Sequence, residues 1–398
     1  IKETKNGKYL VDATSFFIRD AHGVMGRLSA KKQGKYTLDR SRSAINLERI
    51  KAFPKNVEFD VMITFKGVPK GYDISSVVPT STSVTVNQHH SFIALPDNNY
   101  TPRKFDPRSG ANAMSYLDYA TPVNEPIKKR FIYRHRLEKK NPNAAKSEAV
   151  EPIIYYLDRG TPEPVRSALL DGARWWNQAF ESIGFTNAFQ VKMLPEDADL
   201  LDVRYNVIQW VHRSTRGWSY GSSVSDPRTG EILESDIIWY HNHLRSYRNR
   251  YLIETGAANP KARTLDTPEE EIGEMMRRVI SHEIGHALGL PHNMKASSAY
   301  PVDSLRSGSF TQKFGIATSI MDYARYNYVA QPGDKKIRFV RQLGPYDDYS
   351  IEWGYRYFGD TPENEREILR KFVDSKSLDP IYMFGGYGND PNSQTENI

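Results

Sequence analysis

Four residues within a short stretch have the side chains that metal-assisted hydrolysis requires. The stretch reads His282-Glu283-Ile284-Gly285-His286, and His292 follows six residues later. A spacing of four places the imidazoles of His282 and His286 on one face of a helix, where both can reach the same ion. Glu283 directly follows the first imidazole and can take a proton from a water on that ion without being a ligand itself.

Gly289 and His292 extend this pattern beyond the helix. Gly289 lets the chain turn sharply at the helix C-terminus, and His292 then returns as a third nitrogen ligand. Three protein nitrogens leave the fourth tetrahedral position of zinc for water, which is typical of a catalytic zinc site. The pattern therefore predicts one catalytic Zn²⁺ held by His282, His286 and His292. Two exposed histidines on an ordinary helix, and a noncatalytic zinc site, are the alternatives.

Periodicity and turn chemistry predict the elements that must position these residues. The zinc helix is expected from a capping box at Thr267 to about Leu288. An alternation of strands and helices precedes it, with a helix capped by Thr161 that runs to about Ile183. The expected strands are 152–157, 189–193, 206–211, 222–224 and 237–240, and a third helix is expected over 361–374.

Residues 1–148 have a different pattern. Runs of β-favouring residues occur at 57–65, 83–86 and 91–95, turn residues are dense, and no helix is predicted. The polar stretch 141–151 is a candidate boundary. We therefore expect a β-rich N-terminal domain of unknown role at 1–148 and a catalytic domain at 149–398, which together give an α+β fold.

Composition limits the classes of function. The 398 residues contain no cysteine, which excludes disulfides, thiolate ligands and a cysteine nucleophile. No apolar run is long enough for a transmembrane helix. The net charge of +6 is mild, and the basic run Lys128–Lys140 is interrupted by Glu138. A solvated connector is therefore favoured over a nucleic-acid surface. The chain begins at Ile1 without a signal-peptide pattern, which says little about export, and its oligomeric state cannot be read.

Two segments resemble a known family. His282-Glu283-x-x-His286-x-x-Gly289-x-x-His292 resembles the long zinc signature of the metzincin metallopeptidases, and Ser319-Ile320-Met321-Asp322-Tyr323 resembles their methionine turn. The resemblance implies that Met321 forms an apolar floor beneath the imidazoles. It also implies that Tyr323 is a switchable ligand or an oxyanion hydrogen-bond donor, with an ordinary core or rim tyrosine as the alternative.

The order of elements from Pro152 onward is also similar to that of a metzincin catalytic domain. The resemblance implies a zincin-like fold, with a twisted mixed sheet, a zinc helix and a methionine turn. Its upper subdomain would be 149–292 and its lower subdomain 293–398, with the segment 343–351 resembling the start of the last helix. A strand carrying Gly221, Ser222, Ser223 and Val224 would edge the cleft and pair with an extended substrate.

More widely, the chain is similar to large bacterial envelope zinc metalloproteases with a β-rich N-terminal domain. The segments 175–180 and 204–222 carry this similarity. It implies a secreted, periplasmic or cell-envelope endopeptidase that cleaves peptides or proteins through a zinc-activated water, with Glu283 as general base. Asn293 departs from the residue that well-known metzincin branches place after the third histidine, so no branch is assigned and no substrate preference is transferred.

Several weaker alternatives remain at this level. The protein could be an envelope binding protein on a metallopeptidase scaffold, or a zinc amidase acting on cell-wall peptides. The turn Asp226–Gly230 could approach a structural Ca²⁺ loop, although a plain turn is favoured. His241 and His243 could bind a second metal if both lay on one strand face.

Overall fold

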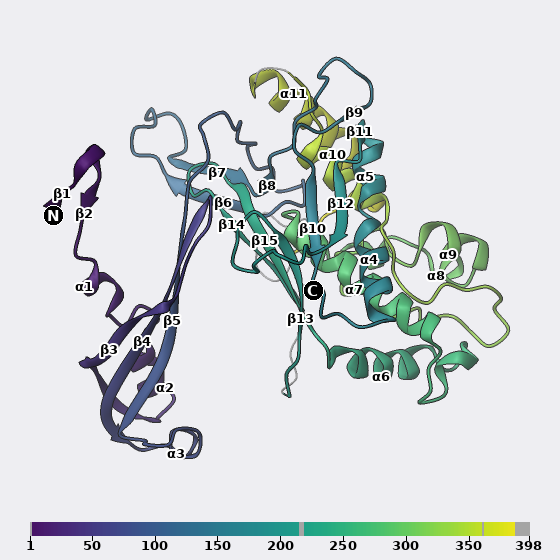
Figure 1. The fold of residues 1–398 in the computed structure, drawn as a ribbon. Coiled ribbons are helices and arrows are strands. Elements are labelled where there is room, and N and C mark those ends of the chain that lie inside the picture. Colours follow the sequence, from purple (N-terminus) through teal and green to yellow (C-terminus); the bar gives the residue numbers. More distant parts are fainter. Residues whose placement is uncertain (1, 215–218, 360–361, 387–398) are drawn as a thin grey trace. The chain divides into compact units, whose positions relative to one another are not determined.

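The computed structural model describes residues 2–214, 219–359 and 362–386, and the chain divides into two compact units (Figure 1). Unit 1 consists of residues 1–95 and 201–203, and unit 2 of residues 96–200 and 204–398. The units therefore divide well before the expected boundary at residue 148. The physical reason is that the segment 96–148 contributes Ile132 and Leu137 to the buried cores of unit 2.

Unit 1 is built on a three-stranded antiparallel sheet in the order β3-β4-β5. The expected strands at 83–86 and 91–95 are one continuous strand, β5, which pairs along β4 from Lys66↔Ser83 to Asn56↔Ile93. The prediction that this part has no helix is wrong, because three short helices occur beside the sheet. Their apolar side chains, including Phe17 and Ile74, join Val61, Ile63 and Phe65 in one core. The elements are β1 Lys2–Glu3, β2 Tyr9–Leu10, α1 Thr14–Phe17, α2 Val24–Ala30, β3 Gly34–Ala52, β4 Asn56–Pro69, α3 Tyr72–Val77 and β5 Ser83–Ile93.

Unit 2 contains a mixed sheet in the order β12-β10-β13-β15-β14, with β8 added to β15. Five of its strands, β8, β10, β12, β13 and β15, run parallel, whereas β14 is antiparallel to β15 and lies at one end of the described sheet. The predicted strands at 152–157, 189–193, 206–211, 222–224 and 237–240 are all present. Their bounds are β10 Ile153–Leu157, β12 Phe189–Met193, β13 Asn206–Val211, β14 Tyr220–Ser225 and β15 Glu231–Tyr240. The others are β6 Ala113–Leu117, β7 Lys128–Ile132, β8 Arg134–His135, β9 Ser147–Glu148 and β11 Phe185–Thr186.

Helices α4 and α7 pack against each other beside this sheet (Figure 1). Strands and helices thus occur in both units, which confirms the α+β class. The helices are α4 Val165–Arg174, α5 Asn177–Ser182, α6 His243–Thr255, α7 Glu269–Ala287, α8 Val302–Leu305, α9 Gly308–Phe314, α10 Pro345–Tyr355 and α11 Pro362–Lys376. No helix in the described ranges is long and apolar enough to cross a membrane.

The expected helix 161–183 is two helices, α4 and α5, and its cap is misplaced. Thr161 lies in a turn, where its N–H donates to the Asp158 carbonyl, and α4 begins only after Pro164. The interruption falls at Trp175 and Trp176. There the indole Nε1–H of the fully buried Trp176 donates to the Ser281 carbonyl of α7 at 2.8 Å.

Helix α7 also begins without the predicted capping box. The Thr267 hydroxyl makes no cap hydrogen bond; it lies 3.4 Å from the Thr264 carbonyl, and Pro268 occupies the N-cap. Three glutamates in the first turn favour the positive end of the helix dipole instead. The expected helix over 361–374 is α11, although its predicted first residue lies outside the described ranges. Residues 215–218 of the segment 204–222, which carries part of the family similarity, also lie outside the described ranges. Helix α6 was not predicted.

Candidate metal centre

The three predicted imidazoles come together at the C-terminal end of α7. His282 and His286 lie one turn apart, and their ring centroids are 4.7 Å apart. His292 lies 4.5 Å from His286 and 5.2 Å from His282 by the same measure. The donor atoms of the three side chains all lie within 4.8 Å of one another, and within the described ranges this is the one group of His, Asp and Glu residues that could hold a metal ion.

Backbone carbonyls fix the orientation of two of these rings. His282 Nδ1–H donates to the Ile320 carbonyl and His286 Nδ1–H to the Leu290 carbonyl, both at 2.8 Å. With Nδ1 engaged, each ring presents its unprotonated Nε2. The Nε2 atoms of His286 and His292 lie 3.0 Å apart. This donor set fits a zinc ion, because neutral imidazole nitrogens are among its preferred ligands.

Electrostatics keep the imidazoles neutral. Burial lowers the pKa of His282 well below its usual value, and the charges of His286 and Arg341 lower it further. Burial also lowers the pKa of His286, and it lowers that of His292 to about 4. An unprotonated imidazole is the form that binds a metal, so the site is arranged for a cation at neutral pH.

The turn that returns His292 depends on Gly289. Its φ of +95° is left-handed, and the N–H groups of Gly289 and Leu290 donate to the carbonyls of His286 and Gly285, which closes a Schellman motif. A Cβ at position 289 would lie 2.1 Å from the Tyr133 carbonyl oxygen. The Gly289 carbonyl also accepts from the N–H of Asn112 at 2.8 Å. The segment 112–133 therefore supports the turn, and local sequence gives no signal for this distant contact.

Met321 and its turn lie directly against α7. Met321 is buried, and a Cβ added to Gly285 would meet its Sδ at 2.2 Å. Asp347 holds the turn in place. Its carboxylate accepts from the Ser319 hydroxyl at 2.6 Å and from the Ile320 N–H at 2.8 Å. Since the Ile320 carbonyl orients His282, Asp347 is connected to the site through a single residue, Ile320.

Asn293, which departs from the metzincin pattern, is fully buried and forms hydrogen bonds to two other segments of the chain. Its Nδ2 donates to the Met383 carbonyl at 3.1 Å, and its Oδ1 accepts from the Gly385 N–H at 2.9 Å. Its own N–H donates to the Met321 carbonyl. Asn293 therefore ties the residue after His292 to the methionine turn and to the segment 383–385.

Glu283 is buried beside the imidazoles and is held by β14. Burial raises its pKa to about 8, whereas a hydrogen bond from the Gly221 N–H and the charge of Arg278 act in the opposite direction. A Cβ on Gly221 would lie 2.7 Å from the Glu283 carbonyl oxygen, so β14 packs closely on α7 here. Ser222, Ser223 and Val224 continue this strand with exposed side chains.

Tyr323 lies at the open side of the imidazole group. Its ring centroid is 4.2 Å from that of His292 and 5.5 Å from that of His282, and about half of the residue is exposed. It is therefore neither a core residue nor remote from the imidazoles.

The weaker metal candidates lie elsewhere and have other partners. The Asp226 carboxylate accepts from Nε and Nη2 of Arg228 at 2.6–3.1 Å, which supports a plain turn and gives calcium no support. His241 stacks on His212. His243 belongs to α6, where its Nδ1 accepts from the Ser219 N–H, so the two histidines do not share a strand face.

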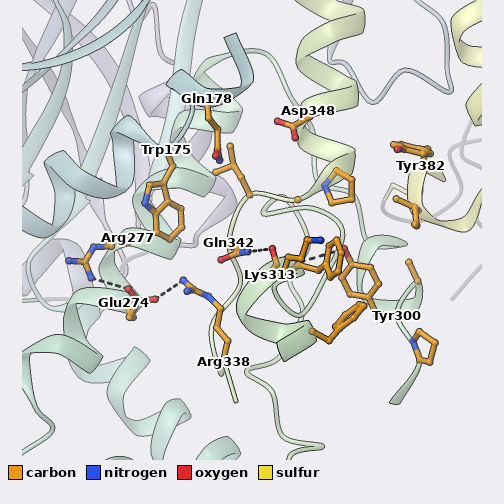
Figure 2. A pocket seen from close by; sticks show the side chains of 18 of the residues that line it. Trp175, Gln178, Glu274, Arg277, Tyr300, Lys313, Arg338, Gln342, Asp348 and Tyr382 are labelled. Atoms are coloured by element: carbon orange, nitrogen blue, oxygen red, sulfur yellow. Dashed lines mark hydrogen bonds and ion pairs between the residues drawn. The ribbon is translucent and has the colours of Figure 1, made fainter. Parts of the chain in front are cut away.

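Two cavities of unit 2 differ in their relation to this site. The cavity in Figure 2, about 1110 Å³, has charged side chains that pair with one another: Glu274 contacts Arg277 and Arg338. Among the described residues that line it, none is a predicted site residue. A smaller cavity of about 370 Å³ opens directly on His286 and His292.

Comparisons with known proteins agree with this geometry. Residues 264–398 match the family model described as Met-zincin, and residues 1–140 match a model described as a domain of unknown function (DUF5117). No curated protein matches the chain. The Met-zincin match contains the three imidazoles, Glu283 and the methionine turn. The resemblance to the metzincin clan of zinc metallopeptidases is thus confirmed, and it rests on the Met-zincin match over residues 264–398.

Proposed function

We propose that this protein is a zinc-dependent endopeptidase in which His282, His286 and His292 hold one Zn²⁺ and Glu283 is the general base. The convergence of three neutral imidazoles beside a buried carboxylate supports this role. A structural site would be closed by a fourth protein ligand, whereas a substrate can approach here from the side of Tyr323. A secreted, periplasmic or envelope location is part of the proposal and rests on the family resemblance alone.

Each residue has a defined part in peptide hydrolysis. A bound zinc ion would polarise the scissile carbonyl and lower the pKa of the attacking water. Glu283 accepts the proton of that water and delivers it to the leaving amine. The Gly221 N–H holds the Glu283 carboxylate in place during both transfers. Tyr323 donates a hydrogen bond to the substrate oxygen as negative charge develops there.

Strand β14 supports binding of an extended peptide. It ends the described sheet, and Ser222, Ser223 and Val224 have exposed side chains. Its backbone groups can therefore pair with a substrate strand. Because Gly221 contacts Glu283, a peptide paired to this strand would pass beside the general base. The scissile bond of such a peptide would then lie next to the imidazoles.

The substitution Glu283→Ala tests the enzymatic role. We expect it to leave about one zinc ion per chain and to lower cleavage of an unfolded protein about 10²–10⁴-fold, the usual effect of removing a general base. Zinc is measured by elemental analysis and cleavage with a fluorogenic unfolded substrate. The matched control is Glu269→Gln, which removes an exposed carboxylate from the first turn of α7.

Two other outcomes would replace the proposal. A zinc-loaded wild type that cleaves nothing in a broad peptide library would favour a binding protein on a metallopeptidase scaffold. Cleavage confined to cell-wall peptides would favour a zinc amidase.

A further inference from the structure

The cavity beside His286 and His292 has an unusual set of walls. Phe105, Pro107 and Ala111 line one part, and Pro291 and Phe384 another. Among the described residues that line it, the one permanent charge is the guanidinium of Arg130, and there is no carboxylate. Arg130 is partly buried, and a partly buried cation without an anion is unfavourable, so this arrangement points to a ligand that supplies the anion.

Arg130 differs from the arginines that follow it in the basic run. Arg134 donates to Tyr100 Oη and to the carbonyls of Gly354 and Thr101. Arg136 forms a two-pronged ion pair with Glu231 at 2.7 and 3.0 Å. Neither is therefore a solvated connector residue. Arg130 has no side-chain hydrogen bond or ion pair within the described ranges.

The Arg130 guanidinium is nevertheless held in position. Its Cζ lies 3.7 Å from the centroid of the Phe105 ring, a close cation–π contact. The Phe105 N–H donates to the Arg130 carbonyl at 3.2 Å, which fixes the two backbones. A guanidinium stacked by its face keeps its N–H edge available, and that edge matches the two oxygens of a carboxylate.

We propose that this cavity is a substrate subsite that selects a carboxylate next to the scissile bond, with Arg130 as the specificity-determining residue. This inference rests on the proposed peptidase function. The carboxylate belongs either to a Glu or Asp side chain of an internal residue or to the C-terminus of a short peptide. Arg130 binds the carboxylate beside the apolar side chains of Phe105 and Phe384.

Matched peptides test the selectivity. A series in which Glu replaces Gln at each position around the cleavage site is digested, with free and amidated C-termini as separate arms. We expect wild type to cleave one Glu peptide about tenfold or more faster than its Gln partner, since a hydrogen bond from a guanidinium to a carboxylate is stronger than one to a neutral amide. A preference that disappears on amidation instead assigns the subsite to the C-terminal carboxylate.

Variants identify the residue responsible. Arg130→Gln should bring the Glu/Gln ratio close to one while cleavage of the Gln peptide persists, and Arg130→Lys should restore part of the preference. Arg130→Glu should favour a Lys peptide. Lys128→Gln is the matched control, because it removes an exposed positive charge from the same strand outside the cavity. A Glu/Gln ratio that Arg130→Gln leaves unchanged, or no carboxylate preference in wild type, would overturn the subsite.

A binding measurement separates this proposal from the peptidase function. Glu283→Gln is loaded with zinc, and its affinity for fluorescent Glu and Gln peptides is measured with and without Arg130→Gln. Tighter Glu binding that requires Arg130, together with no cleavage by wild type, retains the subsite and rejects the peptidase. Cleavage without charge preference in either measurement retains the peptidase and rejects the subsite.

Discussion

Asp347 shows how a buried residue outside the imidazole group can control the candidate metal centre. Its carboxylate accepts from the Ser319 hydroxyl and from the N–H groups of Ile320 and Gly344. The Ile320 carbonyl in turn accepts from His282 Nδ1. Hydrogen bonds of this kind fix the orientation of a ligand ring before the metal arrives. Asp347 is thus expected to influence zinc affinity without touching the ion.

The substitution Asp347→Asn tests this influence. We expect zinc affinity to fall about tenfold, the lower end of the usual effect of altering the direct partner of a ligand. Asp347 acts only through Ile320, and the amide of Asn cannot accept from all three donors. Affinity is measured by competition with a chromogenic chelator. Asp348→Asn is the control: it removes the neighbouring carboxylate of the same helix turn, which makes no hydrogen bond to the methionine turn. Equal affinities in the two variants would contradict this connection.

Residue types and spacing sufficed to predict the imidazoles, because a helix brings i and i+4 together wherever it lies. Gly289 and His292 followed from the same local geometry. Asn112, Arg130 and Tyr133 could not be predicted, since their positions depend on how a distant segment folds back onto the turn at Gly289. Arg130 was interpreted as part of a solvated run because charge spacing does not reveal which side chains a later strand or cavity will receive.

At the level of elements, the contact between α4 and α7 depends on Gly172. A Cβ there would lie 2.5 Å from the Arg277 Cα and 2.7 Å from Ile280 Cγ2. The Ser281 hydroxyl donates to the Gly172 carbonyl at 2.6 Å. The backbones of the two helices are therefore in close contact one turn before His282. An alanine at 172 requires α4 to move away from the helix that carries the imidazoles.

We expect Gly172→Ala to lower the free energy of unfolding of unit 2 by ~1–3 kcal/mol, the usual cost of overpacking. Gly354→Ala in α10 should instead raise it by ~0.4–1 kcal/mol, because no atom lies within 4 Å of the added Cβ and the unfolded chain loses freedom. Urea unfolding followed by tryptophan fluorescence measures both. Stabilisation by both alanines would show that α4 and α7 can separate at no cost.

Elements were predicted well where a run of β-favouring or apolar residues decides the structure, and poorly where a single residue was expected to act as a cap. The strands β10, β12 and β13 are of the first kind. Thr161 and Thr267 are of the second kind, because a threonine before a proline also fits a turn. The break between α4 and α5 arises from the burial of Trp176 against α7, a tertiary effect that overrides helical periodicity.

For the whole molecule, sequence families and compact units divide the chain at different places. The DUF5117 match runs to residue 140, whereas unit 1 ends at Leu95 and regains residues 201–203. Asn56 explains that return, since its Nδ2 donates to the Leu201 carbonyl and its Oδ1 accepts from the Val203 N–H. The polar stretch 141–151 marks a change of composition, but side chains on both sides of it belong to unit 2.

Two buried or half-buried histidines should give the units opposite responses to acid. His135 in unit 2 is buried, and burial lowers its pKa to about 4. A folded-state pKa below the unfolded value of about 6.5 means that its contribution to stability is present above pH 6.5 and is lost as the pH falls toward 4. For His89 in unit 1, burial lowers the pKa, but hydrogen bonds to Asp60 and Glu58 outweigh this, and the net shift is upward. Its contribution is present below pH 6.5 and is lost as the pH rises through the higher folded-state pKa.

All six tryptophans lie in the residues assigned to unit 2 and none in those of unit 1, so tryptophan fluorescence reports the unfolding of unit 2 alone. We expect unit 2 to lose ~2 kcal/mol through His135 between pH 7 and pH 5, and His135→Gln to remove that part of the pH dependence. If His135→Gln left the acid slope of the fluorescence transition unchanged, the burial of a neutral imidazole at this position would be contradicted.

Hydrogen exchange of the β4 and β5 amides reports unit 1, where wild type should gain protection relative to His89→Gln as the pH falls from 8 to 6. An unaltered difference between wild type and His89→Gln across that range would contradict the role of the Glu58–His89–Asp60 cluster in the same way.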